Sequence, residues 1–195
     1  MSLKGKTAIV TGGSRGIGAG IAHELAKRGA KVLITFGSAE DRAQQVIESI
    51  KAAGGQASCV KADCRSLEAP RIVVDAAMYA FGSDGIDIII NNAGAGDELF
   101  TKDLTYEHWD KMFHTNVRFP MFLVKECLPH LQKGGRIINL SSVVARQGWV
   151  MHAAYGATKA GMESLARTWA VELGHKYGVT VNCVNPGPVQ TDMWT

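Results

Sequence analysis

Short apolar runs alternate with longer amphipathic stretches along the whole chain. A β-branched apolar run predicts a strand, whereas apolar residues at helical spacing predict a helix with one face on a core. The apolar runs predict strands over residues 7–10, 31–36, 58–62, 86–90, 136–140 and 179–184. The amphipathic stretches predict helices over residues 17–27, 41–53, 67–81, 106–115, 120–132 and 153–175. Alternating strands and helices favour an α/β fold, a doubly wound parallel sheet with helices on both faces.

The 195 residues are expected to form one domain, because the chain has no fixed-period repeat, no low-complexity tract and no linker. A hydrophobic content of 46% with 20% charged residues is typical of a globular protein and excludes a disordered one. The formal net charge is only +3, and the lysines and arginines are scattered singly. Nucleic acid is therefore not an expected partner.

Membrane and metal binding are not expected either. No apolar run approaches the roughly 18 residues that span a bilayer, and the N-terminus leads straight into a predicted strand without room for a signal peptide. We therefore expect a cytoplasmic location. The four cysteines form no CxxC pair and the six histidines show no metal-ligand spacing, which favours free thiols and no metal site.

A glycine-rich turn follows the first predicted strand, with the sequence Thr11-Gly12-Gly13-Ser14-Arg15-Gly16-Ile17-Gly18. Glycines let the backbone turn sharply and approach a ligand, and the next helix begins with unpaired N–H groups. The position between strand and helix favours a Rossmann-like site for a dinucleotide pyrophosphate, although the spacing is GxxxGxG rather than GxGxxG. A tight connection without a ligand is the alternative.

The same turn matches GxSxG, the motif that places the nucleophilic serine of an α/β-hydrolase, here Ser14. Such a nucleophile needs an oxyanion loop from an earlier strand, and only ten residues precede this turn. The missing context disfavours a hydrolase.

The end of the second predicted strand bears on the choice of cofactor. An NAD-specific site places an acidic side chain about 20 residues after the glycines, where it accepts from the ribose 2′-OH. Residues Phe36-Gly37-Ser38 carry no carboxylate, and the Arg15 guanidinium could meet a 2′-phosphate. This favours NADP(H) over NAD(H), with a solvated surface charge as the other interpretation of Arg15.

Tyr155 and Lys159 stand four residues apart at the start of the last predicted helix, which places them on one face, one turn apart. Lowering a tyrosine pKa from ~10 to ~7 requires roughly 4 kcal/mol in favour of the phenolate. A unit charge at ~4 Å supplies about that much at an effective dielectric constant of ~20. A lysine next to the phenol, helped by an oxidised nicotinamide, would therefore be enough. The pair predicts a tyrosine that transfers a proton, whereas alone it could be an accident of helical spacing.

Together these motifs closely resemble those of the short-chain dehydrogenase/reductases, over essentially the whole chain. The matching residues, in the family's order, are the glycine-rich turn, Asp63, Asn91-Asn92-Ala93-Gly94, Asn116, Ser142, Tyr155-x-x-x-Lys159 and Pro186-Gly187-x-Val189-x-Thr191. Any one of these motifs is weak, but their joint occurrence is specific. The resemblance implies an NADPH-dependent carbonyl reductase acting on an apolar ketone or the corresponding alcohol.

The resemblance also implies the role of each residue. Tyr155 would be the general acid or base, and Ser142 would bind the substrate oxygen, with Ser141 structural. Lys159 would lower the pKa of Tyr155 and bind ribose, and Asn116 would hold a water that resupplies protons. Cofactor contacts are implied for Gly12, Ser14, Arg15, Gly16, Ile17, Gly18, Ser38, Asp63, Cys64, Asn91, Ala93, Gly94, Tyr155, Lys159, Pro186, Gly187, Val189 and Thr191.

Three of these contacts have individual assignments from the family. Asp63 would contact the adenine, Asn91 the ribose side, and Thr191 the nicotinamide carboxamide. Each of these polar residues could also serve as a cap or turn former.

Family members normally continue past this point with a substrate-covering segment and a final strand. The resemblance therefore implies that the domain 1–195 is C-terminally incomplete or naturally short. An exposed strand edge and a pocket without a lid would follow, so we expect weak turnover. A catalytically impaired regulatory or scaffold protein that binds cofactor on the same fold is the alternative function.

The expectations for the substrate and for self-association are broader. Trp149, Met151 and His152 lie between Ser142 and Tyr155, where substrate-facing residues are expected, and they suggest a bulky apolar ketone. Trp149 could instead simply fill the core. The loop 95–103, with three acidic residues, is expected to border the substrate. The pattern is similar to the 3-oxoacyl-carrier-protein reductases and to the polyketide naphthol reductases, which leaves the ketone open. The resemblance implies a homodimer or homotetramer through helices 120–132 and 153–175, whose apolar side chains could equally serve the chain's own core.

Overall fold

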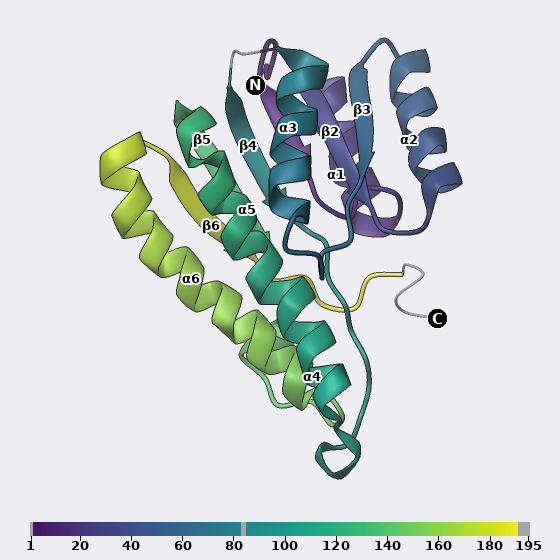
Figure 1. Ribbon diagram of the computed structural model, residues 1–195, viewed down its shortest axis with the longest axis vertical. Coiled ribbons are helices and arrows are strands. Elements are labelled where there is room, and N and C mark those ends of the chain that lie inside the picture. Colours follow the sequence, from purple (N-terminus) through teal and green to yellow (C-terminus); the bar gives the residue numbers. More distant parts are fainter. Residues whose placement is uncertain (1, 83–84, 191–195) are drawn as a thin grey trace.

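The computed structural model describes residues 2–82 and 85–190, and its centre is a six-stranded parallel sheet of order β3-β2-β1-β4-β5-β6 (Figure 1). The strands are β1 Thr7–Val10, β2 Lys31–Phe36, β3 Gln56–Lys61, β4 Ile86–Asn91, β5 Leu131–Leu140 and β6 Thr180–Val184. The helices are α1 Gly16–Lys27, α2 Glu40–Ala52, α3 Ala69–Phe81, α4 Tyr106–Phe113, α5 Phe119–Cys127 and α6 Ala153–Tyr177. All five strand pairs are parallel, which confirms the doubly wound Rossmann-like fold.

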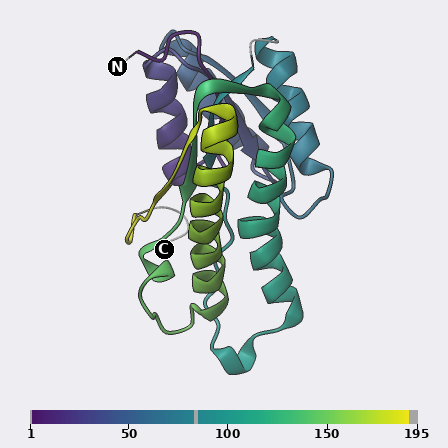
Figure 2. The same cartoon turned by 90° about the vertical axis from the view of Figure 1, so that its left-hand side faces the viewer.

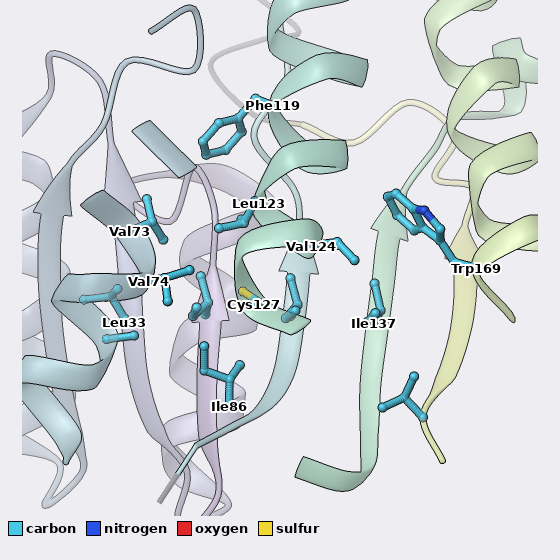
Figure 3. Packing of buried hydrophobic residues seen from close by; sticks show 14 of the residues in the cluster. Leu33, Val73, Val74, Ile86, Phe119, Leu123, Val124, Cys127, Ile137 and Trp169 are labelled. Atoms are coloured by element: carbon cyan, nitrogen blue, oxygen red, sulfur yellow. The ribbon is translucent and has the colours of Figure 1, made fainter. Parts of the chain in front are cut away.

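Helices cover both faces of the sheet and bury a separate core on each. Helices α3, α5 and α6 pack on one face, and α1 and α2 pack on the other. Figure 3 shows the first core, where Val124 of α5 and Trp169 of α6 lie near Ile137 of β5. Every residue of β4 is buried, as expected for a central strand covered on both sides. Each fully buried aliphatic or aromatic side chain contributes about 1.5–3 kcal/mol.

The helices predicted over 106–115 and 120–132 belong to one helical rod (Figure 2). A single π-helical turn, His114–Arg118, joins α4 to α5. Pro120 lies in the first turn of α5, where a helix tolerates proline best because the N–H that proline lacks is not needed there. The π turn thus places Asn116 at an irregular point of the backbone, a feature often found at functional sites.

The other differences from the predicted boundaries are local. α5 ends at Cys127 and a 3₁₀ turn, Leu128–His130, follows, so β5 begins at Leu131, five residues before its prediction. Gly134 and Gly135 hid this extension, because glycines at strand positions resemble a turn in sequence. The predicted start of α3 at residue 67 is wrong by two residues, since the helix begins at Ala69 just before Pro70.

The site region lies at the carboxyl ends of the strands. In Figures 1 and 2, α4 and the first turns of α6 extend beyond these ends. In Figure 1, residues 185–190 cross just below the carboxyl ends of the strands. The strand order reverses between β1 and β4, and the crevice at such a point is where open α/β sheets bind ligands. Within the described residues, no helix is both long and apolar enough to span a bilayer.

Candidate functional site

The glycine-rich turn between β1 and α1 has a shape that side chains would block. Gly12 and Gly16 have φ of +64° and +53°, in the left-handed region that favours glycine. A Cβ on Gly18 would collide with the Gly12 carbonyl and lie 2.5 Å from Asn92 Nδ2. α1 begins at Gly16 with no acidic residue in its first turn. The turn therefore presents a close-packed backbone and a positive helix end to the crevice.

The segment after β4 holds this turn in place. The Thr11 hydroxyl accepts hydrogen bonds from the backbone N–H groups of Asn92 and Ala93, at 3.0 and 2.9 Å. The Asn92 side-chain amide donates to the Thr11 and Gly12 carbonyls, at 2.8 and 3.1 Å. The two strand ends at the switch point are thus joined by a hydrogen-bonded network that fixes the crevice.

A cavity of about 430 Å³ opens over this turn and continues to α6. It is lined by most of the residues that the sequence predicted: Gly12, Ser14, Arg15, Gly16, Ile17, Gly18, Ser38, Cys64, Ala93, Gly94, Ser142, Tyr155, Lys159, Pro186, Gly187 and Val189. Its volume lies within the usual range for a site that takes a small ligand. The fold therefore brings the glycine-rich turn and the Tyr155–Lys159 pair into one site.

Lys159 is 5% exposed and points into the end of the sheet. Its Nζ donates to the Leu140 carbonyl at 2.7 Å and lies 5.5 Å from the centroid of the Tyr155 ring. Burial lowers the pKa of the Lys159 ammonium to about 8. The group is thus easier to deprotonate than an ordinary lysine, which is typical of functional sites.

Tyr155 is affected by two opposing contributions to its pKa. Burial raises the pKa of its phenol above the ordinary value, and the hydrogen bond with the Ser142 side chain acts in the opposite direction. The reason is geometric, since the Lys159 ammonium is held by Leu140 rather than against the phenol. In this arrangement the lysine does not bring the pKa of Tyr155 toward 7.

Ser142 stands at the end of β5 with its hydroxyl inside the cavity. Its side chain caps a 3₁₀ turn, Val143–Ala145, by accepting from the Val144 N–H at 3.3 Å. Ser141 also borders the cavity, and its hydroxyl is within hydrogen-bond distance of the Lys159 carbonyl and of Glu163.

Glu163 joins three segments that surround Ser142. Its buried carboxylate accepts from Ser141 at 3.2 Å, from Arg146 at 3.1 Å and from the Asn185 side chain. Asn185 also donates to the Ser142 carbonyl at 3.0 Å. Burial acts to raise the pKa of Glu163, but the hydrogen bonds from Asn185 and Arg146 outweigh it and hold the pKa below the usual value. Sequence reasoning missed Glu163, although it lies one turn after Lys159 on the same helix.

Asn116 is buried behind the cavity rather than in its wall. Its side chain donates to the Ala95 carbonyl at 2.9 Å and to the Thr158 hydroxyl at 3.0 Å, and it accepts from the Ala95 N–H at 2.8 Å. These contacts tie α4–α5 to α6 and to the loop after β4.

Two other predicted residues, Asn91 and Asp63, lie outside the main cavity. The Asn91 side chain is buried in the sheet, where it donates to Asn139 Oδ1 at 2.8 Å. Asp63 lines a smaller neighbouring cavity, and its carboxylate pairs with Arg65 at 3.0 Å, which lowers the pKa of Asp63. Thr191 lies outside the described residues.

Several cavity residues belong to no family motif, although the loop 95–103 was expected to border the substrate. Phe36, Gly37 and Ala39 flank Ser38, Thr115 precedes Asn116, and a loop after Ala95 contributes Gly96, Asp97 and Glu98. These loop residues follow no motif, and their place in the wall depends on tertiary contacts. Among the described residues, no group of three or more His, Cys, Asp or Glu could hold a metal ion.

The chain is similar to many known proteins. The short chain dehydrogenase family matches residues 6–195. The short-chain dehydrogenase/reductase FrzI of Cladobotryum is 53% identical over 192 residues, which cover 98% of this chain and 74% of that protein. The hydroxynaphthalene reductase arp2 of Aspergillus fumigatus is 40% identical and is covered over 70% of its length.

Solved structures give the same result. A short chain dehydrogenase from Burkholderia cenocepacia in complex with NADP superposes with a TM-score of 0.94, at 41% identity and over 78% of its chain. A blue fluorescent protein from a metagenomic library, in complex with NADPH, has a TM-score of 0.94 at 35% identity. With sequence, fold and site in agreement, this chain belongs to the short-chain dehydrogenase/reductase family of oxidoreductases.

Proposed function

We propose that this chain is an NADP(H)-dependent carbonyl reductase that interconverts an apolar ketone and its secondary alcohol. The observation that carries the proposal is the single cavity that joins the glycine-rich turn to Ser142, Tyr155 and Lys159. A ligand long enough to span it would have its phosphates at the turn and its reactive end beside the tyrosine. The reductase names of several relatives and the NADP complex of a related structure support the same assignment.

The residues present fit a dinucleotide cofactor. The positive φ of Gly12 and the lack of room for a Cβ on Gly18 create a backbone cradle at the start of α1. Such a cradle binds phosphate through backbone N–H groups and the helix dipole. Gly12, Ser14, Gly16, Ile17 and Gly18 would hold the pyrophosphate there.

The end of β2 supports NADP(H) over NAD(H). Phe36, Gly37 and Ser38 line the cavity and carry no carboxylate to accept from a ribose 2′-OH. Arg15 lines the same region from the start of α1 and would pair with a 2′-phosphate.

In the reduction that we propose, bound NADPH would supply a hydride to the carbonyl carbon. The chain's own residues would bind and protonate the carbonyl oxygen. Tyr155 donates its phenolic proton to that oxygen as the general acid, and Ser142 donates a hydrogen bond to it. The raised pKa of Tyr155 keeps the phenol protonated before the reaction, as a proton donor requires.

Lys159 and Asn116 would restore the proton. With its pKa lowered to about 8, the Lys159 ammonium can pass a proton on near neutral pH more readily than an ordinary lysine. Behind it, the side chain of Asn116 is hydrogen-bonded to the Ala95 backbone and to the Thr158 hydroxyl. We propose that Asn116 organises a water there that links Lys159 to solvent.

We also propose self-association through α5. Met121 and Phe122 are 37% and 44% exposed on this helix, whereas Met162 and Trp169 of α6 are buried in the chain's own core. The apolar residues named for α6 thus serve the monomer, and those of α5 remain available to a second copy.

A thermal-shift titration with NADPH and NADH in parallel tests the cofactor assignment. We expect stabilisation by NADPH at much lower concentration than by NADH, and an Arg15→Gln variant should narrow the difference. Stabilisation by neither cofactor would contradict the proposal. Tyr155→Phe then separates an enzyme, which loses ketone reduction, from a regulatory cofactor-binding protein, in which nothing measurable changes.

A further inference from the structure

The cavity wall beside Tyr155 is built from two segments without a family motif. A turn before α6 contributes Trp149 and His152, and the loop after β4 contributes Asp97 and Glu98. The His152 ring stands edge-on to the Tyr155 ring, with centroids 6.1 Å apart, and edge-on to Trp149 at 5.8 Å. Any substrate that reaches Tyr155 therefore meets an imidazole.

The hydrogen bonds of His152 fix which ring nitrogen carries the proton. Nδ1 lies 2.8 Å from the Val150 carbonyl, and a carbonyl oxygen only accepts, so Nδ1 must be the donor. Nε2 of the neutral ring is then an acceptor. The side chain is 16% exposed, which leaves this nitrogen partly accessible from the cavity.

A second acceptor lies beside the first. Glu98 Oε1 is 3.9 Å from His152 Nε2, too far for a hydrogen bond, and the Glu98 side chain is 63% exposed. The neighbouring carboxylate of Asp97 is already paired with Lys111 at 2.8 Å. The wall thus presents two adjacent acceptors, an imidazole nitrogen and a carboxylate, which together need N–H or O–H donors.

The turn that carries His152 contains a strained backbone conformation. Met151, between Val150 and His152, has φ of +67°, a conformation that non-glycine residues rarely adopt. Its carbonyl accepts from the Leu99 N–H at 3.0 Å, which joins the turn to the loop that carries Glu98. Strained backbone of this kind is found most often at active sites and ligand-binding positions.

We propose that His152 and Glu98 form a recognition site for a hydrogen-bond donor on the substrate, a hydroxyl or amino group remote from the reacting carbonyl. His152 Nε2 accepts from the donor, and Glu98 accepts a second N–H or an adjacent O–H. The substrate class is then a ketone with a polar donor at the end that contacts His152, rather than a wholly apolar ketone. This inference rests on the proposed function and refines its substrate.

The test compares matched ketones that differ only in the donor. The dissociation constants of 3-methyl-, 3-hydroxy- and 3-aminoacetophenone are measured by ligand-observed NMR at about pH 8, where an ordinary imidazole is neutral. We expect the hydroxy ketone to bind about three- to tenfold more tightly than the methyl ketone, the usual range for one hydrogen bond. The amino ketone should gain at least as much, because it has two N–H donors.

Three variants assign the preference to residues. His152→Phe keeps the ring and should make the hydroxy and methyl ketones bind equally, and His152→Leu repeats this with a different shape if the first variant fails to fold. Glu98→Gln should keep the hydroxyl preference and reduce that for the amino ketone. His175→Phe, an exposed histidine at the other end of α6, should change nothing.

The outcomes separate this inference from the proposed function. Equal binding of the methyl and hydroxy ketones by the unmodified chain, or a preference that survives in His152→Phe, would overturn the donor site. A preference that depends on His152 without any NADPH-dependent turnover would support the site and contradict the reductase. NADPH-dependent turnover without any preference for a donor would support the reductase and contradict the donor site.

Discussion

The cavity has two halves that are built in different ways. The half over β1 and α1 is made of backbone, and its shape follows from strand ends and glycines that have no room for a side chain. The half around Tyr155 is made of side chains from α6, the 141–152 segment and the loop after β4. The shape of the first half depends on the backbone, whereas the second half depends on side chains from loops and α6, where we propose that the substrate is recognised.

Replacing Tyr155 with Phe should separate the two halves most completely. The variant removes the proton donor and keeps the ring, so we expect kcat for ketone reduction to fall by about 10²–10⁴-fold. The dissociation constant of NADPH, measured by fluorescence titration, should change by less than about threefold. If kcat and NADPH affinity fell by similar factors, the two halves of the cavity would not be independent.

Gly18→Ala should break the backbone half. The new Cβ meets the Gly12 carbonyl and the Asn92 side chain, so the turn must open. Overpacking of this kind costs about 1–3 kcal/mol, and we expect NADPH to bind up to about 100-fold more weakly. Gly20→Ala is the matched control on the same helix, because a Cβ there contacts nothing within 4 Å. It should leave NADPH affinity unchanged and stabilise the chain by about 0.5–1 kcal/mol.

Lys159 lies between the halves, and its burial should appear in the pH dependence of stability. Its pKa is lowered from 10.5 to about 8, so between these values the unfolded chain binds more protons than the folded one. The free energy of unfolding must then rise with pH across this window. Below the window it is lowered, because the folded chain must bury a protonated lysine. Relative to Lys159→Met, the unmodified chain should gain roughly 2 kcal/mol from pH 7 to about pH 9.5, measured by urea unfolding. Parallel curves for the two proteins would contradict the burial argument.

The two halves also explain what could be predicted from the sequence. The glycine-rich turn, the Asn92 segment and the Tyr155–Lys159 spacing are local, because strand ends and helical turns fix their geometry. The sheet and its helices followed from the alternation of apolar and amphipathic stretches. Other features of the site depend on contacts between distant segments that no motif predicts: the buried pair of Asn91 with Asn139, the Lys159 bond to Leu140, and the carboxylate of Glu163.

The Asn91–Asn139 pair shows this limit in detail. The motif indicated a cofactor contact for Asn91, yet its partner comes from a strand 48 residues later. Asn91 Oδ1 and Asn139 Nδ2 have no hydrogen-bond partner among the described residues. Only the register of β4 against β5, which pairs these two positions, brings the amides together. No spacing within either segment contains that information.

Glu163→Gln should have the smallest effect. It tests whether the side-chain half depends on the hydrogen bonds that Glu163 accepts next to Ser142. Gln keeps the shape but removes the charge, which weakens the bonds from Arg146 and Asn185 that surround Ser142. The low pKa of Glu163 means that its contribution to stability is present above the ordinary value of 4.5 and is lost as pH falls through the folded value. We expect a loss of about 1–2 kcal/mol near pH 7.

A positioning role predicts more than this loss of stability. If Glu163 holds Ser142 in place, Glu163→Gln should lower kcat a few-fold at an unchanged NADPH dissociation constant. Arg146→Met is the control, because the Arg146 side chain is 69% exposed and its ion pair should contribute less than about 1 kcal/mol. A loss of stability without any change in kcat would limit Glu163 to the fold. If kcat falls in Glu163→Gln but not in Arg146→Met, and NADPH affinity is unchanged in both, then Glu163 supports the side-chain half and not the backbone half.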